Sequence, residues 1–460
     1  MAASTHHQPD DTERKPPNIL FFLPDQHRPD WLGLNPALPL RTPHSDALAQ
    51  RGVRFTRAFC PSPLCAPSRA ALASGRDYHR CGVVNNNQDY PLDQPTYYQA
   101  LRDGGYRVAG VGKFDLHKGL AKPEDLDWHL DGSRLLHEWG FTEGIDNEGK
   151  LDGSNAYRLH GGPRGPYLAF LQDRGLAETY VREHETRKQH MDAYTTALPD
   201  DAYCDNWIAE NGLRFLRGFP ADQPWHLVIN FTGPHNPMDV TATMLATGPS
   251  PGWQDVDLPL PHNNDHPDRE GLLRNRQNYA AMIENIDRHV GRYIDVVRER
   301  GELDNTLIVY ASDHGEMLGD HGRWGKSTWH SPSTGIPLIV AGPGLTRGVT
   351  SDALVSLNDL TATFLELAGV EPLPTMDSQS LLPVLSGSAQ NHRDMVISGL
   401  DDWRMIYDGR YKLVLSTQRA PLLFDLDNDP WEDTDLAAQR PDVVARLRNQ
   451  LAERTGFVGR

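Results

Sequence analysis

Short apolar runs that alternate with helical patterns are the main feature of this chain. The runs are apolar on both alternating sets of positions, which is typical of parallel strands buried on both faces. Five runs have this pattern: NILFFLPD (18–25), YRVAGVGKF (106–114), PWHLVINFTGPH (224–235), NTLIVYASDHG (305–315) and IPLIVAGPG (336–344). The alternation predicts an α/β domain with a mostly parallel central sheet flanked by helices.

Two helical patterns are well delimited. SDALAQRG (45–52) follows the first run, with Ser45 or Asp46 as the expected cap and Gly52 as the stop. YAAMIENIDRHVGRYIDVVRERG (279–301) has apolar residues spaced by three and four and ends at Gly301. Residues 115–200 are polar and weakly periodic, and we interpret them as insertions over one end of the sheet.

The character of the chain changes near residue 386. MIYDGRYKLVLS (405–416) and PLLFDLDNDPWED (421–433) predict antiparallel strands, and PDVVARLRNQLAER (441–454) predicts a terminal amphipathic helix. We therefore expect a catalytic domain over 18–385 and a smaller α+β subdomain over 386–460. The polar residues 1–17 are expected to be a disordered tail.

The composition and net charge of the chain limit which kinds of molecule it could bind. The 460 residues are 38% hydrophobic and 23% charged, as in ordinary globular proteins, and carry a formal charge of −17. That charge argues against nucleic acid or an anionic membrane as the partner. No stretch resembles a secretion signal or a membrane span, and four cysteines without a CxxC pair make no disulfide framework. A cytoplasmic enzyme is the expectation, and a homo-oligomer is left open.

Residues able to bind a metal follow two of the strand candidates. The first run ends in Asp25-Gln26 and the fourth in Asp313-His314. Because ligands bind beyond the carboxyl ends of strands in open α/β sheets, these residues are expected to converge. Carboxylate and amide oxygens with one imidazole suit Ca²⁺, Mg²⁺ or Mn²⁺. The alternative is that each Asp is a turn or capping residue.

Cationic residues follow the same runs. Lys113, His235 and Lys326 could bind the oxygens of a tetrahedral anion or protonate a leaving group. The alternative for each is a solvated or hydrogen-bonded surface residue. The Asn triplet at 85–87 is interpreted as a turn or cap, with substrate contact as the minor alternative.

Cys65 precedes Pro67-Ser68-Arg69 and a helical pattern, which places it near a helix N-terminus. The amide groups and dipole of that end favour an anion, and Arg69 adds a positive charge one turn later. This environment would lower the pKa of the thiol and make it nucleophilic. The alternative is a small buried hydrophobic residue.

At these residues the chain resembles the formylglycine-dependent sulfatases of the alkaline phosphatase superfamily. CAPSR (65–69) matches their Cys-x-Pro-Ser-Arg signature, and ALASGR continues it. Further similar stretches, in family order, are PNILFFLPDQ, YRVAGVGKFDLH, GPHNP, DHGEMLGDHGRWGKS and YKLVLS…LFDLDNDPWEDTDLA. The resemblance covers almost the whole chain beyond the tail and implies an alkaline-phosphatase-like fold.

The resemblance also implies a mechanism. A maturation enzyme oxidises Cys65 to formylglycine; one hydroxyl of the hydrated aldehyde attacks sulfur, and the other expels sulfate. The metal ligands implied are Asp25, Gln26, Asp313, His314 and the modified Cys65. Arg69 and Lys113 would hold the formylglycine hydroxyls, and His235 and Lys326 would bind the sulfate and assist the leaving oxygen.

Departures from the common family pattern bear on the metal and the substrate. Asp-Gln and Asp-His replace the usual Asp-Asp and Asp-Asn, as in choline sulfatases and phosphonate monoester hydrolases, and make Mn²⁺ a rival to Ca²⁺. The usual Gly-Lys-x-His becomes GKFDLH, so Asp115 and His117 are alternatives for the histidine, and His117 is preferred. STWHSPSTGIP follows Lys326, so His330 is a candidate for a specificity pocket.

The leading hypothesis is hydrolysis of a small sulfate ester, whether aryl, alkyl, choline-like or sugar. A phosphonate monoesterase or phosphodiesterase with the same site is the first alternative. A non-catalytic sulfate-binding protein with unmodified Cys65 is the alternative from another class.

Overall fold

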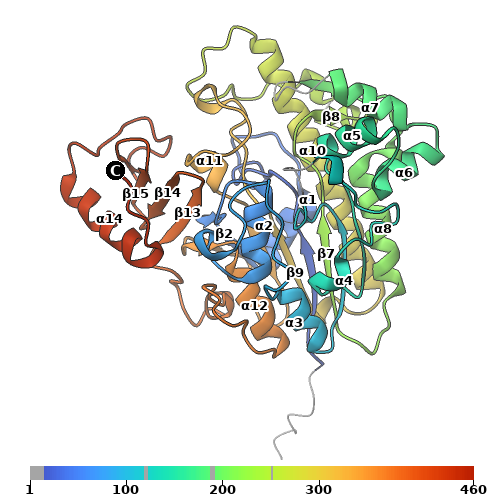
Figure 1. The fold of residues 1–460 in the computed structure, drawn as a ribbon, viewed down its shortest axis with the longest axis horizontal. Helices are drawn as coiled ribbons and strands as arrows, with labels where there is room; N and C mark the ends of the chain where they lie inside the picture. The colour runs from blue at the N-terminus through green and yellow to red at the C-terminus, as the bar shows by residue number, and fades with distance from the viewer. Residues whose placement is uncertain (1–14, 119–122, 187–191, 250–251) are drawn as a thin grey trace, which may run out of the picture.

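An eight-stranded sheet crosses the larger part of the molecule in this computed structural model, which describes residues 15–118, 123–186, 192–249 and 252–460 (Figure 1). From edge to edge the strands are β11 (Val349–Ser351), β2 (Val53–Phe55), β10 (Leu338–Ala341), β9 (Thr306–Ala311), β1 (Asn18–Phe22), β7 (Trp225–Asn230), β4 (Arg107–Gly112) and β5 (Glu143–Asp146). All five predicted strands lie in this sheet. It is mostly parallel, as predicted, but β10 runs antiparallel to both β9 and β2, so the expectation of a parallel strand at 336–344 is wrong.

Alternation along β1 explains the two helical layers. Ile19 and Phe21 point into one apolar core, and Leu20 and Phe22 point into the other. The first core is covered by α2 (Cys65–Ser74), α3 (Tyr97–Asp103) and α12 (Asp359–Ala368). The second is covered by α1 (Pro43–Arg51), α8 (Cys204–Gly218) and α10 (Arg269–Glu299). Because β1 is buried on both faces, its sequence is continuously apolar.

The two predicted helices form, with different starts. Helix α1 begins at Pro43 and ends before Gly52, and its N-cap is Thr42, which makes no side-chain capping bond. The predicted cap at Ser45 or Asp46 is therefore wrong, because proline at the first helical position starts this helix earlier. Helix α10 extends from Arg269, where Asp268 accepts a hydrogen bond from the N–H of Gly271 at 2.8 Å.

The C-terminal part forms a separate antiparallel sheet with a helix on one face, at the left in Figure 1. Its elements are β13 (Val396–Leu400), β14 (Trp403–Tyr407), β15 (Tyr411–Ser416), β16 (Leu422–Asp425) and α14 (Pro441–Thr455). Leu447 and Leu451 of α14 pack against Leu413 on the sheet. The other face packs on the main domain through Trp403 and Trp329, whose ring centroids are 6.0 Å apart. The domain boundary at residue 386 remains a prediction.

The weakly periodic region 115–200 supplies the edge strand β5 and four α-helices among its described residues, and its place over one end of the sheet stays a prediction. These helices are α4 (Leu136–Trp139), α5 (Lys150–His160), α6 (Pro166–Asp173) and α7 (Ala177–Thr186). The remaining short elements are β3 (Ala58–Phe59), β6 (Ala193–Thr195), β8 (Met238–Val240), β12 (Val355–Ser356), α9 (Ala242–Ala246), α11 (Ser331–Thr334) and α13 (Leu382–Leu385). Within the described ranges, no helix has both the length and the apolar composition to cross a membrane. Residues 1–14 of the predicted disordered tail lie outside the described residues.

A buried carboxylate at the start of α12 ties that helix to the chain that follows it. Asp359 is fully buried and receives Nε of Arg393 at 2.8 Å and Nε2 of His392 at 3.0 Å. It also accepts the backbone N–H groups of Ser356 and Gln379, each at 2.9 Å. Burial alone would raise the pKa of Asp359, but Arg393 and His392 hold it below its ordinary value.

We expect Asp359→Ala to lower the free energy of unfolding by about 3–5 kcal/mol, because it leaves the buried Arg393 without its partner. Urea unfolding at pH 7 measures this. Since the folded pKa is depressed, the contribution is complete above the unfolded pKa of about 3.9 and is lost as the pH falls toward the folded pKa. Asp352→Ala, at an exposed position, is the control and should stay within about 0.5 kcal/mol of wild type. If Asp359→Ala also changed the free energy of unfolding by no more than about 0.5 kcal/mol, the buried ion pair would not stabilise the fold.

Candidate active site

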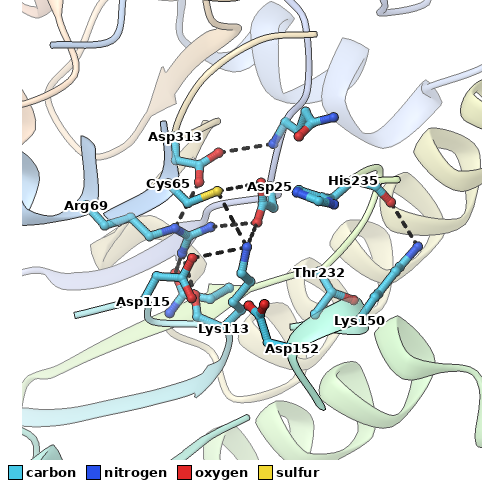
Figure 2. A network of polar contacts seen from close by, with 12 residues as sticks. Asp25, Cys65, Arg69, Lys113, Asp115, Lys150, Asp152, Thr232, His235 and Asp313 are labelled. Carbon is cyan, nitrogen blue, oxygen red and sulfur yellow. Dashed lines mark hydrogen bonds and ion pairs between the residues drawn. The ribbon is translucent and has the colours of Figure 1, made fainter. Parts of the chain in front are cut away.

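The carboxyl ends of neighbouring strands bring the predicted polar residues together (Figure 2). Strand β1 lies between β9 and β7, and β4 follows β7, so the loops after these four strands meet at one edge. These loops carry Asp25 and Gln26 after β1, Asp313 and His314 after β9, Lys113 after β4 and His235 after β7. The predicted convergence is therefore observed.

Cys65 is the first residue of α2, as the sequence predicted. The helix is buried along its whole length, and Cys65 itself is 1% exposed. The N-cap, Leu64, has no side chain able to cap, and the side-chain oxygen of Asn86 accepts the N–H of Ala66 at 3.0 Å instead. The predicted capping role in the Asn triplet is thus confirmed, and Asn86 also lines the pocket described below. The helix N-terminus favours negative charge at position 65.

Four ligand atoms cluster at this edge. One atom each from Asp25, Cys65, Asp313 and His314 lies within 4.8 Å of the other three, and all four side chains are buried. Sγ of Cys65 is 3.3 Å from Nε2 of His314 and 3.8 Å from Oδ1 of Asp25. Nδ1 of His314 lies 3.0 Å from the carbonyl oxygen of Gly315, and this contact orients the ring so that Nε2 faces the cluster. Two carboxylates and an imidazole are a donor set that fits a divalent cation.

Gln26 adds an amide oxygen to this group. Its backbone is held at φ 71°, an uncommon conformation for a residue other than glycine, and its N–H donates to Oδ1 of Asp313 at 3.0 Å. Its side-chain oxygen accepts a hydrogen bond from Nζ of Lys326. Uncommon backbone conformations such as this one occur mostly at functional sites, where they fix the direction of a side chain.

Cations surround the cluster. Arg69 donates from Nε to Oδ2 of Asp313 at 2.9 Å, and Lys113 pairs with Asp25 and, at 3.1 Å, with Asp115. Burial opposes the charge on Lys113, but Asp115 and Asp25 raise its pKa well above the ordinary value, so the ammonium persists. Burial also opposes ionisation of Asp25, yet Lys113 and other cations hold its pKa well below normal. The ammonium of Lys113 and the carboxylate of Asp25 therefore both stay charged despite their burial.

The same cations act on the thiol of Cys65. Nζ of Lys326 lies 3.3 Å from Sγ, and Nζ of Lys113 lies 3.6 Å from it. Burial and Asp25 raise the pKa of Cys65, but Lys113, Lys326 and His314 outweigh them and lower it to about 6. Position 65 is consequently a site where an anionic nucleophile is favoured.

His235 forms the far wall of the site. Its Nδ1 lies 2.5 Å from the carbonyl oxygen of Asn236, which fixes the ring plane. Burial, and then the charge of Lys326, hold the pKa of His235 well below its ordinary value. The imidazole is therefore neutral while the pocket holds no anion, and a sulfate group bound beside it would favour its protonated form.

The cluster opens into a pocket of about 230 Å³. Four predicted residues line it: Cys65, Lys113, His235 and Lys326. Asn86, for which substrate contact was the minor alternative, also lines it. Seven further lining residues were not predicted to contribute: Lys118, Gly149, Lys150, Leu151, Asp152, Thr232 and Asn236. Most of the lining residues have polar or charged side chains, and the ammonium groups of Lys113 and Lys326 lie beside the cysteine.

Lys118 and Asp152 are the clearest omissions of sequence reasoning. Nζ of Lys118 lies 2.8 Å from Oδ2 of Asp115 and 3.0 Å from Oδ2 of Asp152, and the Lys118 side chain is 5% exposed. Asp152 belongs to the first turn of α5, in the region whose pattern gave no assignment. No local signal links these residues, because only the fold brings α5 against the loop after β4.

Three residues proposed from the sequence, His117, its alternative Asp115, and His330, lie outside the pocket lining. Nδ1 of His117 is 2.8 Å from Oδ2 of Asp89, on a side chain that is 30% exposed. Asp115, the alternative to His117, lies buried between Lys113 and Lys118. His330 is buried at the start of α11, with Nδ1 2.7 Å from the hydroxyl of Thr328. Of the two alternatives, Asp115 is the one that contacts residues of the pocket lining, Lys113 and Lys118.

The chain is similar in sequence and in fold to proteins of known families. A family model described as sulfatase matches residues 17–370, and one described as N-sulphoglucosamine sulphohydrolase, C-terminal, matches residues 319–456. A choline-sulfatase of Rhizobium meliloti is 29% identical over 92% of this chain and 82% of its own. An N-acetylglucosamine-6-O-sulfatase of Bacteroides thetaiotaomicron is 25% identical over 86% of this chain and 75% of its own. The solved phosphonate monoester hydrolase SpPMH of Silicibacter pomeroyi superimposes with a TM-score of 0.77 at 25% identity, covering 95% of each chain.

Proposed function

The chain belongs to the sulfatase family, and on that premise we propose that Cys65 is oxidised to formylglycine and acts beside a divalent metal ion. As a sulfuric ester hydrolase the protein converts a sulfate ester and water into an alcohol and inorganic sulfate. One observation carries the proposal: Sγ of Cys65 lies 3.3 Å from both His314 Nε2 and Lys326 Nζ, at the floor of a polar pocket. The reacting atom and the groups that stabilise charge are thus already in contact.

The metal would be held by oxygen and nitrogen donors from two loops. Asp25 and Gln26 supply oxygens from the loop after β1, and Asp313 and His314 supply an oxygen and a nitrogen from the loop after β9. A divalent cation there supplies Lewis-acid activation of the nucleophile and neutralises charge. Ca²⁺ and Mn²⁺ both fit oxygen donors, and the imidazole of His314 favours Mn²⁺.

Formylglycine at position 65 supplies a nucleophile that regenerates itself. A hydrated aldehyde at position 65 would supply one hydroxyl to attack sulfur and a second whose deprotonation would release sulfate and restore the aldehyde. The attacking hydroxyl would lose its proton, and the departing alcohol oxygen would gain one. A maturation enzyme must reach the cysteine for this conversion. Because Cys65 is 1% exposed at the start of a wholly buried helix, we place the conversion before folding is complete.

The cations have separate positions around the reacting atom. Lys113 and Arg69 pair with Asp25 and Asp313, from where they would hold the oxygens of position 65, and Lys113 also lines the pocket. Lys326 and His235 face the pocket, where they bind sulfate oxygens and assist the departing alcohol oxygen. Fixed charges in a buried site stabilise the developing negative charge without rearrangement.

A phosphonate monoester hydrolase or phosphodiesterase is the second candidate, because the fold matches SpPMH over 95% of both chains. Kinetics on paired 4-nitrophenyl sulfate and 4-nitrophenyl phenylphosphonate distinguish the two. Both esters carry one negative charge, so the pocket cations do not distinguish them. We expect the larger kcat/KM for the sulfate, because the family model that matches residues 17–370 is that of the sulfatases. A larger kcat/KM for the phosphonate would reverse the assignment while keeping the same nucleophile.

A further inference from the structure

A buried carboxylate behind the cluster has no part in the chemistry described so far. Glu316, in the loop after β9, is 1% exposed. Its Oε1 accepts the N–H of Leu318 at 2.8 Å and the N–H of Gly325 at 2.6 Å. Its Oε2 accepts a hydrogen bond from the side-chain amide of Gln26. One carboxylate thus contacts both the residue before Lys326 and a proposed metal ligand.

The partners of the Gln26 amide define its orientation. Nε2 donates to Glu316 and lies 3.3 Å from the side-chain oxygen of Asn236, so both neighbours on that side are acceptors. Oε1 lies on the other side, where Lys326 donates to it. An amide has one donating and one accepting end of nearly equal size, so packing alone does not choose between its two orientations.

A carboxylate makes that choice because it has no proton to donate. Oε1 of Glu316 accepts two backbone N–H groups and Oε2 accepts the NH₂ end of the Gln26 amide, so the amide oxygen is left to face the cluster. The uncommon φ of 71° at Gln26, together with the hydrogen bond from its N–H to Asp313, fixes the backbone but leaves the amide free to turn over. The side-chain contact is therefore what decides which atom points inward.

We propose that Glu316 is a positioning residue that orients the Gln26 amide with its oxygen toward the metal site. The inference rests on the proposed function, in which Gln26 is a metal ligand. Through Gly325 the same carboxylate also fixes the backbone beside Lys326, so that the metal side and the sulfate side of the pocket share one support.

Glu316→Gln tests this with little change of shape. The new amide can keep its oxygen on the N–H groups of Leu318 and Gly325, which turns its NH₂ toward the NH₂ of Gln26. Two donors then oppose each other, and the Gln26 amide turns its nitrogen to the metal site. We expect the affinity of the metal-stripped, full-length protein for Mn²⁺, measured by calorimetric titration, to fall about 10–100-fold.

A double variant separates orientation from simple anchoring. In Gln26→Glu combined with Glu316→Gln, the amide at 316 donates to a carboxylate at 26, which restores the hydrogen bond with its direction reversed. We expect this variant to bind Mn²⁺ within about tenfold of wild type and more tightly than Gln26→Glu alone, which sets two carboxylates against each other. This second comparison holds even where Glu316→Gln alone does not fold.

Glu148→Gln is the matched control, since Glu148 is also buried and accepts a backbone N–H, from Leu168 at 2.8 Å. Burial raises the pKa of Glu148 to about 7, so an amide is well tolerated there, and Mn²⁺ affinity should stay at the wild-type value. Wild-type Mn²⁺ affinity in Glu316→Gln would overturn this inference, as would a double variant that binds Mn²⁺ no more tightly than Gln26→Glu. Neither result would contradict the proposed function. A wild-type protein that binds no Mn²⁺ and no Ca²⁺ would overturn the proposed metal site and the inference with it.

Discussion

Cys65→Ala should reduce kcat/KM for a sulfate ester by about 10⁴-fold or more, because it removes the side chain whose conversion would create the nucleophile. Sγ of Cys65 is in contact with His314 Nε2 at 3.3 Å and Lys326 Nζ at 3.3 Å, and the remaining pocket can only bind the substrate. The substitution removes one buried sulfur, so the folded structure should persist, with a loss of about 1 kcal/mol of stability. Steady-state kinetics on 4-nitrophenyl sulfate, with circular dichroism for the fold, measure both effects.

Cys81→Ala is the matched control for this experiment. Cys81 is fully buried like Cys65, but its Sγ contacts only backbone carbonyls, 3.3 Å from that of Tyr78 and 3.2 Å from that of Val83. Burial raises the pKa of Cys81 to about 12, so it is an inert structural thiol. We expect its removal to leave kcat/KM near the wild-type value. A Cys65→Ala variant that retains a tenth or more of wild-type activity would remove Cys65 from the reaction.

Asp313→Asn should weaken Mn²⁺ binding and turnover together, by about 100-fold each. One oxygen of Asp313 accepts the N–H of Gln26 at 3.0 Å, and the other lies 2.9 Å from Nε of Arg69 and 3.6 Å from Nε2 of His314. An amide of the same size removes the negative charge and sets its NH₂ group against one of these donors. Calorimetric titration of Mn²⁺ and kinetics at saturating Mn²⁺ measure the two losses.

Asp287→Asn provides the control for a buried carboxylate outside the pocket. Asp287 accepts the N–H of Ser45 at 2.7 Å and that of His44 at 3.0 Å, where α1 meets α10. Its replacement should cost stability but leave the Mn²⁺ affinity unchanged. Equal Mn²⁺ affinity in Asp313→Asn and wild type would show that Asp313 does not bind the metal.

The meeting of polar residues at the strand ends was predictable from the sequence, because it follows from two general properties of parallel sheets. Continuous apolar runs identify buried strands, and the carboxyl ends of parallel strands meet at one edge of a sheet. Asp25 and Asp313 follow two such runs directly, so their meeting needed no knowledge of the distance between them along the chain. The helix N-terminus at Cys65 was likewise a local feature, set by the residues that follow it.

Strand direction could not be read in the same way. The run that forms β10 is buried on both faces, as a parallel strand would be, yet it pairs antiparallel with β9 and β2. Burial on both faces depends on the layers that cover the sheet and not on the direction of the strand. A short apolar run therefore identifies a central strand without giving its direction.

The outer pocket depends on contacts that leave no local pattern. Lys118 and Asp152 meet across 3.0 Å because α5 packs beside the loop after β4, and neither residue is part of a motif. The choice between Asp115 and His117 also depends on the path of that loop, which turns through a positive φ of 52° at Asp115 and leaves His117 against Asp89. Both features depend on tertiary contacts, which secondary-structure propensity and the spacing of residues along the chain do not reveal.

The chemical state of position 65 is the central claim, and mass spectrometry of the tryptic peptide 58–69 tests it most directly. That peptide, AFCPSPLCAPSR, also contains Cys60, which is buried beside Ser398 and has a pKa raised well above normal by burial. In protein purified from its native host, we predict an aldehyde at position 65 that reacts with a hydrazide, and a thiol at position 60 that iodoacetamide alkylates after denaturation. Two alkylated thiols in that peptide, from protein that is active on a sulfate ester, would contradict the account.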